Sequence, residues 1–299
     1  MLKKLLILSG KGGTGKTTTS AAFIRFSQAQ AFADCDVDAP NLHLVEELEG
    51  ERLEKPYIGS EKAKIDPAQC IGCTHCMEVC HFDAIELTSG GKCAVNEYAC
   101  EGCGVCAYAC PMRAIHLEED VAGGQTLYKG GRTFSTATLK MGRGNSGKLV
   151  SAVKLDLFKN APETELAIID GSPGIGCPVM ASISGVDQVL IVAEPSLSGF
   201  SDLERLVRTV ESFQSHAAVC VNKWDVSPEQ TAAIEAFCRE NTVPFAGRVP
   251  FDPAASQAIN EGRSLADVDC PARTALLEVY RNVMELIELP EYAHRAITL

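Results

Sequence analysis

Apolar and polar positions along this chain form two kinds of segment. One kind is a short, continuously apolar run, as in strands buried in a parallel sheet, and it occurs at 5–9, 31–38, 165–170, 188–194 and 216–223. The other kind is longer, has apolar residues at helical spacing, and occurs at 17–30, 145–158, 198–213 and 228–241. Strands that alternate with helices predict an α/β fold with a doubly wound, mostly parallel sheet.

The stretch from about Ile58 to Leu117 breaks this rhythm. Its residues 70–87 (CIGCTHCMEVCHFDAIEL) align with residues 100–117 (CEGCGVCAYACPMRAIHL) at an offset of 30, and both copies end in Ala-Ile-x-Leu. A short internal duplication of this kind predicts two pseudo-symmetric halves. A hairpin is expected just after it, with its turn at Gly130–Gly131.

Because insertions are tolerated at surface connections, we expect a small domain inserted into a larger one. The expected boundaries are 59–118 for the inserted domain, and 1–58 with 119–299 for the discontinuous α/β domain.

Charge and length exclude several classes of function. The 299 residues carry a net charge of −12, which argues against binding to nucleic acid or to an anionic membrane surface. No apolar run approaches the ~20 residues of a membrane-spanning helix. The N-terminal MLKKLLILSG leads into SGKGGTGKT without a cleavage segment of the kind that ends a signal peptide. We therefore expect a cytoplasmic protein with neither a nucleic-acid nor a membrane partner.

Residues 10–17 (GKGGTGKT) fit the phosphate-binding motif G-x-x-x-x-G-K-[ST], and they stand between a predicted strand and a predicted helix. Backbone N–H groups of such a loop and the helix N-terminus favour phosphate oxygens. Lys16 would neutralise the β and γ phosphates, and the Thr17 hydroxyl would bind Mg²⁺. The residues expected to bind nucleotide here are Gly10, Gly12, Gly13, Thr14, Gly15, Lys16, Thr17 and Thr18.

Lys11 adds a second lysine to this loop, so that it reads KGGTGKT. The loop resembles the deviant Walker A motif of the MinD, Mrp and nitrogenase-iron-protein group of ATPases. The resemblance implies that Lys11 reaches the nucleotide of a partner subunit. It also implies that the active form is a homodimer or a heterodimer with a paralogue.

Two further stretches are similar to the switch regions of that group. Residues 34–44 (DCDVDAPNLHL) resemble the first switch, and they imply that Asp36 orients the attacking water while Asp34 lies near the metal. Residues 168–176 (IIDGSPGIG) resemble the second switch, in which Asp170 would contact Mg²⁺ through water. The implied catalytic set is Lys11, Lys16, Asp36 and Asp170, and the implied magnesium set is Thr17, Asp34 and Asp170.

Residues 222–225 (NKWD) follow a predicted strand and allow two interpretations of the base. In GTPases the Asp of N-K-x-D accepts hydrogen bonds from guanine, whereas in the MinD-like group an Asn here contacts adenine. Because the loop and switches resemble that group, we expect ATP, with Asn222 and Asp225 near the base, and we keep GTP as the alternative.

Eight of the fourteen cysteines form two motifs with the spacing C-x₂-C-x₂-C-x₃-C. In this spacing three thiolates of one motif bind one cluster and the fourth binds the other cluster. Two [4Fe–4S] clusters are therefore predicted, one held by Cys70, Cys73, Cys76 and Cys110, the other by Cys100, Cys103, Cys106 and Cys80. Structural zinc is the alternative, but it usually takes C-x₂-C pairs separated by a longer spacer.

Residues 60–118 resemble bacterial two-cluster ferredoxins, with one departure: Cys80 is followed by His81, where the second motif has Cys110-Pro111. Among the remaining cysteines, Cys177 lies seven residues after Asp170. In the nitrogenase iron protein a cysteine at this offset helps to bridge a cluster across the dimer, so we keep that role open beside a packed thiol.

Three functions are compatible with these features, and the whole chain resembles MinD/Mrp-like ATPases that contain a two-cluster ferredoxin domain. The first is a nucleotide-switched electron carrier with an unknown redox partner. The second is an ATPase for the assembly or delivery of metal or iron–sulfur cofactors to an acceptor protein, with a GTP-using metallochaperone as a variant. The third, a MinD-like spatial regulator, is disfavoured because the tail 276–299 is acidic and contains Pro290.

Overall fold

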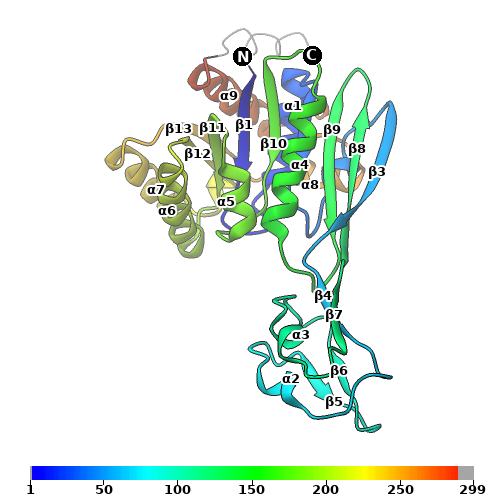
Figure 1. Cartoon of the computed structure of the whole chain (residues 1–299). Helices are drawn as coiled ribbons and strands as arrows, with labels where there is room; N and C mark the ends of the chain where they lie inside the picture. The colour runs from blue at the N-terminus through cyan, green and yellow to red at the C-terminus, as the bar shows by residue number, and fades with distance from the viewer. Residues whose placement is uncertain (1, 289–299) are drawn as a thin grey trace. The chain divides into compact units, whose positions relative to one another are not determined.

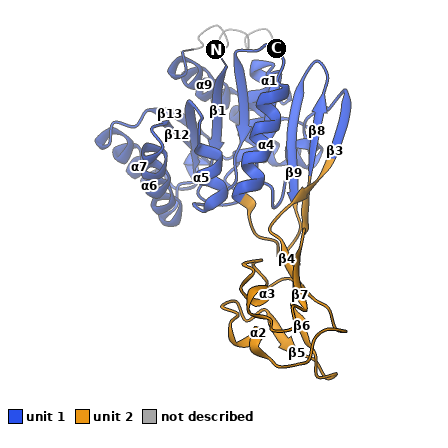
Figure 2. Cartoon of the chain, in the orientation of Figure 1, with its two compact units in different colours: residues 1–54, 125–138, 147–299 blue, residues 55–124, 139–146 orange. Residues whose placement is uncertain are grey.

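The computed structural model describes residues 2–288, so that Pro290 and the last residues of the predicted tail, 289–299, lie outside the described residues. The chain divides into two compact units (Figure 2). Unit 1 comprises residues 1–54, 125–138 and 147–299, and unit 2 comprises residues 55–124 and 139–146.

The central sheet of the described residues has nine strands, and from β13 to β9 all neighbouring strands are parallel (Figure 1). In sheet order these strands are β13 (Phe245–Val249), β12 (His216–Asn222), β11 (Gln188–Ala193), β1 (Lys3–Leu8), β10 (Leu166–Asp170), β2 (Ala31–Asp34), β9 (Thr133–Leu139), β8 (Val121–Lys129) and β3 (Glu51–Ile58). The prediction of a mostly parallel α/β sheet is confirmed.

Helices cover both faces of this sheet. The helices are α1 (Lys16–Ser27), α4 (Ser146–Asn160), α5 (Cys177–Ile183), α6 (Leu197–Ser212), α7 (Pro228–Glu240), α8 (Pro253–Asn260) and α9 (Pro271–Leu286), with 3₁₀ turns η1 (Leu42–Leu44), η2 (Trp224–Val226) and η3 (Leu265–Asp267). Leu5 and Ile7 of β1 point to the face covered by α1 and α9, because side chains alternate along a strand. Helices α4 and α5 lie in front of the other face in Figure 1.

The register of the parallel strands sets the position of the polar residues. Asp34 at the end of β2 is paired with Asp170 at the end of β10, and Ile7 near the end of β1 is paired with the same Asp170. The carboxyl ends of these neighbouring strands therefore gather the predicted loop and both predicted switches at one edge of the sheet.

Unit 2 is built from two similar halves. Its antiparallel pairs are β4 (Lys62–Ile65) with β7 (Ile115–Glu118), and β5 (Ile85–Leu87) with β6 (Cys93–Val95), and its short helices are α2 (His75–Glu78) and α3 (Val105–Ala109). Its core contains few large side chains and consists mostly of cysteine, alanine and isoleucine.

Candidate nucleotide site and cysteine cavities

The loop between β1 and α1 adopts a conformation that depends on glycine. Gly15 has φ 96°, and a Cβ added to it would lie 2.3 Å from Nδ2 of Asn222. That Nδ2 donates to the carbonyl of Thr14 at 2.7 Å, so the end of β12 supports the loop from below. A cleft of about 640 Å³ opens above the loop, lined by Ser9, Lys11, Gly12, Gly13, Gly15, Lys16, Thr17, Thr18, Asp36, Asp38, Ala39, Asn41, Leu44, Val45, Ser172, Pro173, Pro178 and Ile259.

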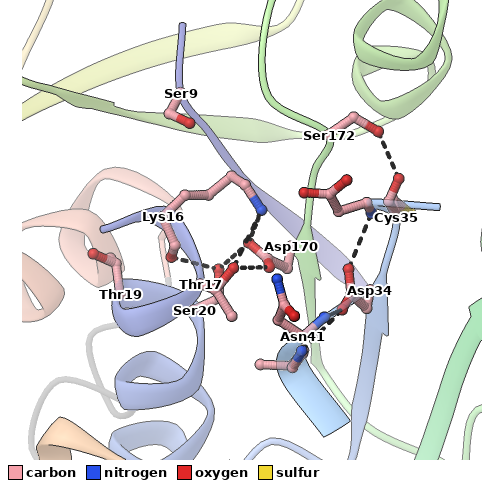
Figure 3. Close-up of polar contacts among 12 residues, drawn as sticks. Ser9, Lys16, Thr17, Thr19, Ser20, Asp34, Cys35, Asn41, Asp170 and Ser172 are labelled. Carbon is pink, nitrogen blue, oxygen red and sulfur yellow. Dashed lines mark hydrogen bonds and ion pairs between the residues drawn. The ribbon is translucent and has the colours of Figure 1, made fainter. Parts of the chain in front are cut away.

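The buried carboxylate of Asp170 binds three polar side chains of the first turns of α1 (Figure 3). Asp170 Oδ1 lies 2.9 Å from Lys16 Nζ and accepts a hydrogen bond from Ser20 Oγ at 2.7 Å, while Oδ2 accepts one from Thr17 Oγ1 at 2.8 Å. Burial acts to lower the pKa of Lys16, but Asp170 and Asp34 outweigh it, so this pKa is raised. The lysine therefore stays charged inside the protein, as a phosphate-binding lysine must.

Asp34 organises the first switch through the backbone. Its Oδ1 accepts from the amide of Asp36 at 3.0 Å, and its Oδ2 accepts from the amides of Asn41 and Leu42 at 2.8 and 2.9 Å. Burial, with the neighbouring Asp170, raises the pKa of Asp34 to about 7. Three amide donors leave this carboxylate oriented toward its own loop, while Asp36 is half-buried and lines the cleft.

The two switches are joined by hydrogen bonds at the ends of β2 and β10. The amide of Cys35 donates to the carbonyl of Asp170 at 2.7 Å. Ser172 Oγ, just after β10, donates to the carbonyl of Cys35, just after β2, at 2.6 Å (Figure 3). The two switches are therefore in direct contact through buried residues.

Lys11 lies on the rim of the cleft, where its ammonium is 2.7 Å from Glu194 Oε2 and 3.3 Å from Ser196 Oγ. Glu194 follows β11 directly, and Lys223 lies 3.8 Å from its other oxygen. In this structure Lys11 thus has an ion-pair partner within its own chain.

A second cavity adjoins the loop where a base would follow the phosphates. It is lined by Gly13, Gly15, Thr18, Thr19, Asn222, Lys223, Val249, Pro250, Phe251, Asp252, Ala255, Ser256, Ile259, Asn260, Leu265, Ala272 and Leu276. Asp225 Oδ1 accepts from the amide of Phe251 at 2.7 Å, which positions the Pro250–Asp252 wall. The side chains of Asn222 and Asp225 thus support the loop and the wall of this cavity.

In unit 2 the eight motif cysteines line two separate cavities. The first cavity is bordered by Cys70, Cys73, Cys76 and Cys110, and the second by Cys80, Cys100, Cys103 and Cys106. Each cavity therefore takes three cysteines from one motif and the fourth from the other. In each set two cysteines are buried, one is half-buried and one is exposed.

Four cysteines line each cavity, which is the number of thiolates that a [4Fe–4S] cluster takes. Among residues 2–288, no three His, Cys, Asp or Glu side chains converge as the ligands of one metal ion would. A [4Fe–4S] cluster instead takes one thiolate at each of four irons. The amides of Ala84 and Ala114 already donate to the sulfurs of Cys80 and Cys110, both at 3.4 Å, and such donors stabilise thiolate ligands.

Comparison with known proteins places the larger unit. Residues 5–265 match the description CobQ/CobB/MinD/ParA nucleotide binding domain. The chain belongs to this nucleotide-binding family. Its fold is similar to the cell division ATPase MinD of Pyrococcus furiosus, with a TM-score of 0.58 at 18% identity over 96% of this chain and 100% of that one.

Two relatives of this family member span nearly the whole chain. An uncharacterised protein of Methanocaldococcus jannaschii is 31% identical over 96% of this chain and 98% of its own length. The cytosolic Fe-S cluster assembly factor NBP35 of Eremothecium gossypii is 22% identical over 95% of this chain and 76% of its own length. Within the described part of the chain, no helix is both long and apolar enough to cross a membrane.

Cys177 is exposed and begins α5, directly after the second switch. The other cysteines outside the cavities of unit 2 are less accessible: Cys35, Cys220 and Cys238 are buried, and Cys270 is half-buried. The hypothesis that Cys177 contributes to a metal site in a dimer therefore stays compatible with its position.

Sequence reasoning missed three residues of this site: Ser20, Ser172 and Glu194. Ser20 stands one helical turn after Lys16, so the helical spacing could have placed it beside Asp170. Glu194 ends the apolar run 188–194 and could have been suspected as a buried-strand acid. Nothing in the local sequence indicates that it pairs with Lys11.

Proposed function

We propose that this protein binds and hydrolyses Mg-ATP, holds two [4Fe–4S] clusters, and uses its nucleotide state to control electron transfer from them. The observation that carries the proposal is one chain with a buried lysine–aspartate phosphate site and two four-cysteine cavities. Each site contains the residue types that its ligand requires. Neither site takes a residue from the other.

In the nucleotide site, backbone amides of the loop and the Lys16 ammonium would bind the β and γ phosphates. Lys16 would exchange Asp170 for phosphate, and the Thr17 hydroxyl would then bind Mg²⁺ with Asp170 in support. Asp36 lines the cleft and would hold the attacking water. Asp34, whose oxygens accept three amides, would position Asp36 rather than bind the metal directly.

In unit 2, each four-cysteine set would hold one cluster, which supplies a site for one electron. Zinc is disfavoured because a tetrahedral zinc draws four ligands to ~2.3 Å from one ion. The partly buried sulfurs and their amide donors support resident, redox-active clusters rather than clusters in transit.

The position of Lys11 supports a dimer as part of this proposal. Its ion pair with Glu194 lies at the rim of the cleft, with side-chain exposures of 36% and 28%. Such a pair is weak enough to exchange for a phosphate of a partner subunit. We therefore propose that ATP brings together two copies of this chain, or this chain and a paralogue, with each Lys11 reaching across.

A second candidate function is the assembly or delivery of iron–sulfur clusters. It is supported by the relative named as a cytosolic Fe-S cluster assembly factor and by the exposed Cys177 beside the second switch. In that case the clusters of unit 2 would supply electrons for assembly, and a transient cluster would form elsewhere. A MinD-like spatial regulator and a GTP-using metallochaperone remain weaker alternatives.

Anaerobic purification with iron and sulfide counts tests the cluster part of the proposal. About eight irons and eight sulfides per chain, together with [4Fe–4S] EPR signals after reduction, are expected. One or two zinc ions instead would contradict it.

Calorimetry with ADP and GDP tests the base, and tighter GDP binding would overturn the assignment of ATP.

Coupling is tested by measuring ATPase rates with the clusters oxidised and reduced, with Lys16→Ala as the variant that should lose hydrolysis while keeping its iron. A rate that ignores the cluster oxidation state would contradict nucleotide-gated electron transfer. ATP-stimulated transfer of iron and sulfide to an apo-ferredoxin, lost in Cys177→Ala, would favour the assembly function instead.

A further inference from the structure

The duplication in unit 2 extends further upstream than the two cysteine motifs. At the same offset of 30, β4 (Lys62–Ile65) corresponds to residues 92–95, that is, to Lys92 and strand β6. Each strand forms one antiparallel pair, and Ala63 faces Leu117 in its pair just as Cys93 faces Leu87 in the other. Leu87 and Leu117 are themselves equivalent, so the two halves can be compared position by position.

The contacts of these strands with the motifs also repeat. The ammonium of Lys62 donates to the carbonyl of Cys100, and the ammonium of Lys92 donates to the carbonyl of Cys70. Before each motif the chain turns alike, because the amide of Cys70 donates to the Asp66 carbonyl at 3.0 Å. The amide of Cys100 donates to its equivalent carbonyl at the same distance.

The backbone donor to the first sulfur of each motif repeats as well. The amide of Ala63 donates to Sγ of Cys100 at 3.5 Å, and the amide of Cys93 donates to Sγ of Cys70. Both residues are buried, with exposures of 2% and 5%, and each lines the cavity of its own half. The backbone contacts of the two strands with the motifs are therefore equivalent.

The two cavities differ in the side chain at this position. The second cavity has the Ala63 methyl group, while the first has the Cys93 thiol. The Cys93 thiol is in hydrogen-bond contact with the sulfurs of Cys70 and Cys76, which line the same cavity. When Cys70 and Cys76 are thiolate ligands they carry no proton, so the Cys93 S–H group is the donor. The Cys70 sulfur therefore has the backbone amides of Cys93 and Gly72 and, in addition, the Cys93 thiol. The equivalent Cys100 sulfur accepts from the amide of Ala63 and has a methyl group in place of that thiol.

We propose that Cys93 is a positioning residue that donates an S–H hydrogen bond to the Cys70 ligand and thereby raises the reduction potential of the first cluster above that of the second. The inference rests on the proposed cluster binding. Reduction adds negative charge that is shared by the thiolate ligands, and each donor to a ligand sulfur stabilises that charge. The two clusters, each held by four cysteines, would then be ordered, with the first as the preferred electron acceptor.

Cys93 is not needed as a ligand, because the first cavity already has four cysteines that correspond one to one with the four of the second. Its volume is not needed either, since alanine occupies the same buried position in the other half. What the thiol adds over a methyl group is the hydrogen bond.

The experiment is an EPR-monitored redox titration of the full-length protein. Cys93→Ala should lower the midpoint potential of one cluster and leave the other unchanged, with full iron and sulfide counts. Cys93→Ser, which keeps a donor, should show a smaller shift. Ala63→Cys should raise the potential of the other cluster, and Cys270→Ala in unit 1 is the control that should shift neither.

Unchanged potentials in both Cys93→Ala and Ala63→Cys would overturn the inference. Loss of about half of the iron in Cys93→Ala and Cys93→Ser would also overturn it, because Cys93 would then be a ligand. Absence of iron from the wild-type protein would instead refute cluster binding itself, so the two failures can be told apart.

Discussion

At the scale of single residues, the nucleotide site depends on charges and backbone angles that its neighbours hold in place. Asp170 receives Lys16, Thr17 and Ser20, and Gly15 supplies an angle that other residues rarely adopt. The functional side chains are thus arranged before a ligand arrives, which lowers the cost of ordering them on binding.

Gly15→Ala should weaken ATP binding at least about tenfold. Alanine at φ 96° costs about 1–2 kcal/mol, and its Cβ would lie 2.3 Å from Asn222 Nδ2, displacing the amide that supports the loop. Calorimetric titration with Mg-ADP measures the loss. Gly131→Ala, where an added Cβ meets nothing within 4 Å, should bind normally. Equal affinity in the two variants would show that the loop does not need this conformation.

Lys154 of α4 gives a pH dependence that can be checked without nucleotide. Its ammonium donates to the carbonyls of Ala181, Ser182 and Ser184 at 2.9, 2.6 and 2.6 Å, at the C-terminal end of α5. Burial lowers the pKa of Lys154 to about 8, against 10.5 for an exposed lysine. Below pH 8 the folded and the unfolded chain are both protonated at this amine.

Between about pH 8 and 10.5 only the unfolded chain keeps this proton, so this group makes the free energy of unfolding rise with pH. The slope is at most ~1.4 kcal/mol per pH unit. Lys154→Met lacks this titration. The free energy of unfolding of the wild type minus that of the variant should therefore increase over this range. Urea unfolding followed by the fluorescence of Trp224, the one tryptophan of the chain, measures it. A constant difference would contradict the lowered pKa.

Much of the site could be predicted at this scale, because Lys16, Thr17, Asp36 and Asp170 stand in local patterns with a chemical meaning. Glu194 could not, since its pairing with Lys11 joins residues far apart in the sequence. The support that Asn222 gives to Thr14 was hidden for the same reason.

At the scale of elements, the strands that sequence reasoning found are the buried ones. All four residues of β2 are buried, whereas most residues of β3 are exposed, and β3 lacks the apolar run that predicts a strand. The predicted strand 31–38 ends early, at Asp34, because the carboxylate of Asp34 turns the following backbone toward itself. Helix α6 begins one residue before its predicted start, with Ser196 as its cap.

The contact between the phosphate loop and the end of β11 yields a prediction about dimerisation. Glu194→Gln removes the charge that holds Lys11 in its own chain, and an exposed ion pair of this kind contributes about 0.2–1 kcal/mol. If Lys11 acts on a partner subunit, two such pairs are broken per dimer, so the dissociation constant of the ATP-bound dimer should fall about twofold to thirtyfold. Sedimentation equilibrium with a hydrolysis-deficient Asp36→Ala background measures it.

Glu240→Gln makes the same charge change at an exposed site at the end of α7 and serves as the control. If the dissociation constant of the dimer is no lower in Glu194→Gln than in this control, Lys11 does not leave Glu194 on dimerisation.

At the scale of the whole molecule, the two units combine ordinary parallel-sheet architecture with a small cysteine-rich core. The duplication let the sequence predict which cysteines share a cavity, since the spacing alone assigns three to one set and the fourth to the other. The sequence did not predict that residues 139–146 belong to unit 2, because this segment contains no cysteine motif or other repeat of the duplication.

The exchange of cysteines between motifs can be tested by iron counts in pairs of substitutions. Cys70→Ser should remove about half of the iron. In that background, Cys110→Ser should remove little more, because it lines the same cavity, whereas Cys80→Ser should remove most of the remainder. The reverse result would mean that each motif binds its own cluster.

The crossing of the fourth cysteine has a consequence for biosynthesis. A ribosome makes the chain from its N-terminus, and the first three cysteines of one cavity emerge long before Cys110, the fourth. In the other cavity Cys80 is made first, and its three partners, Cys100, Cys103 and Cys106, are made about 20 residues later. A nascent chain that ends before Cys106 lacks cysteines of both sets. Both sets are therefore completed within a few residues of synthesis, at Cys106 and at Cys110.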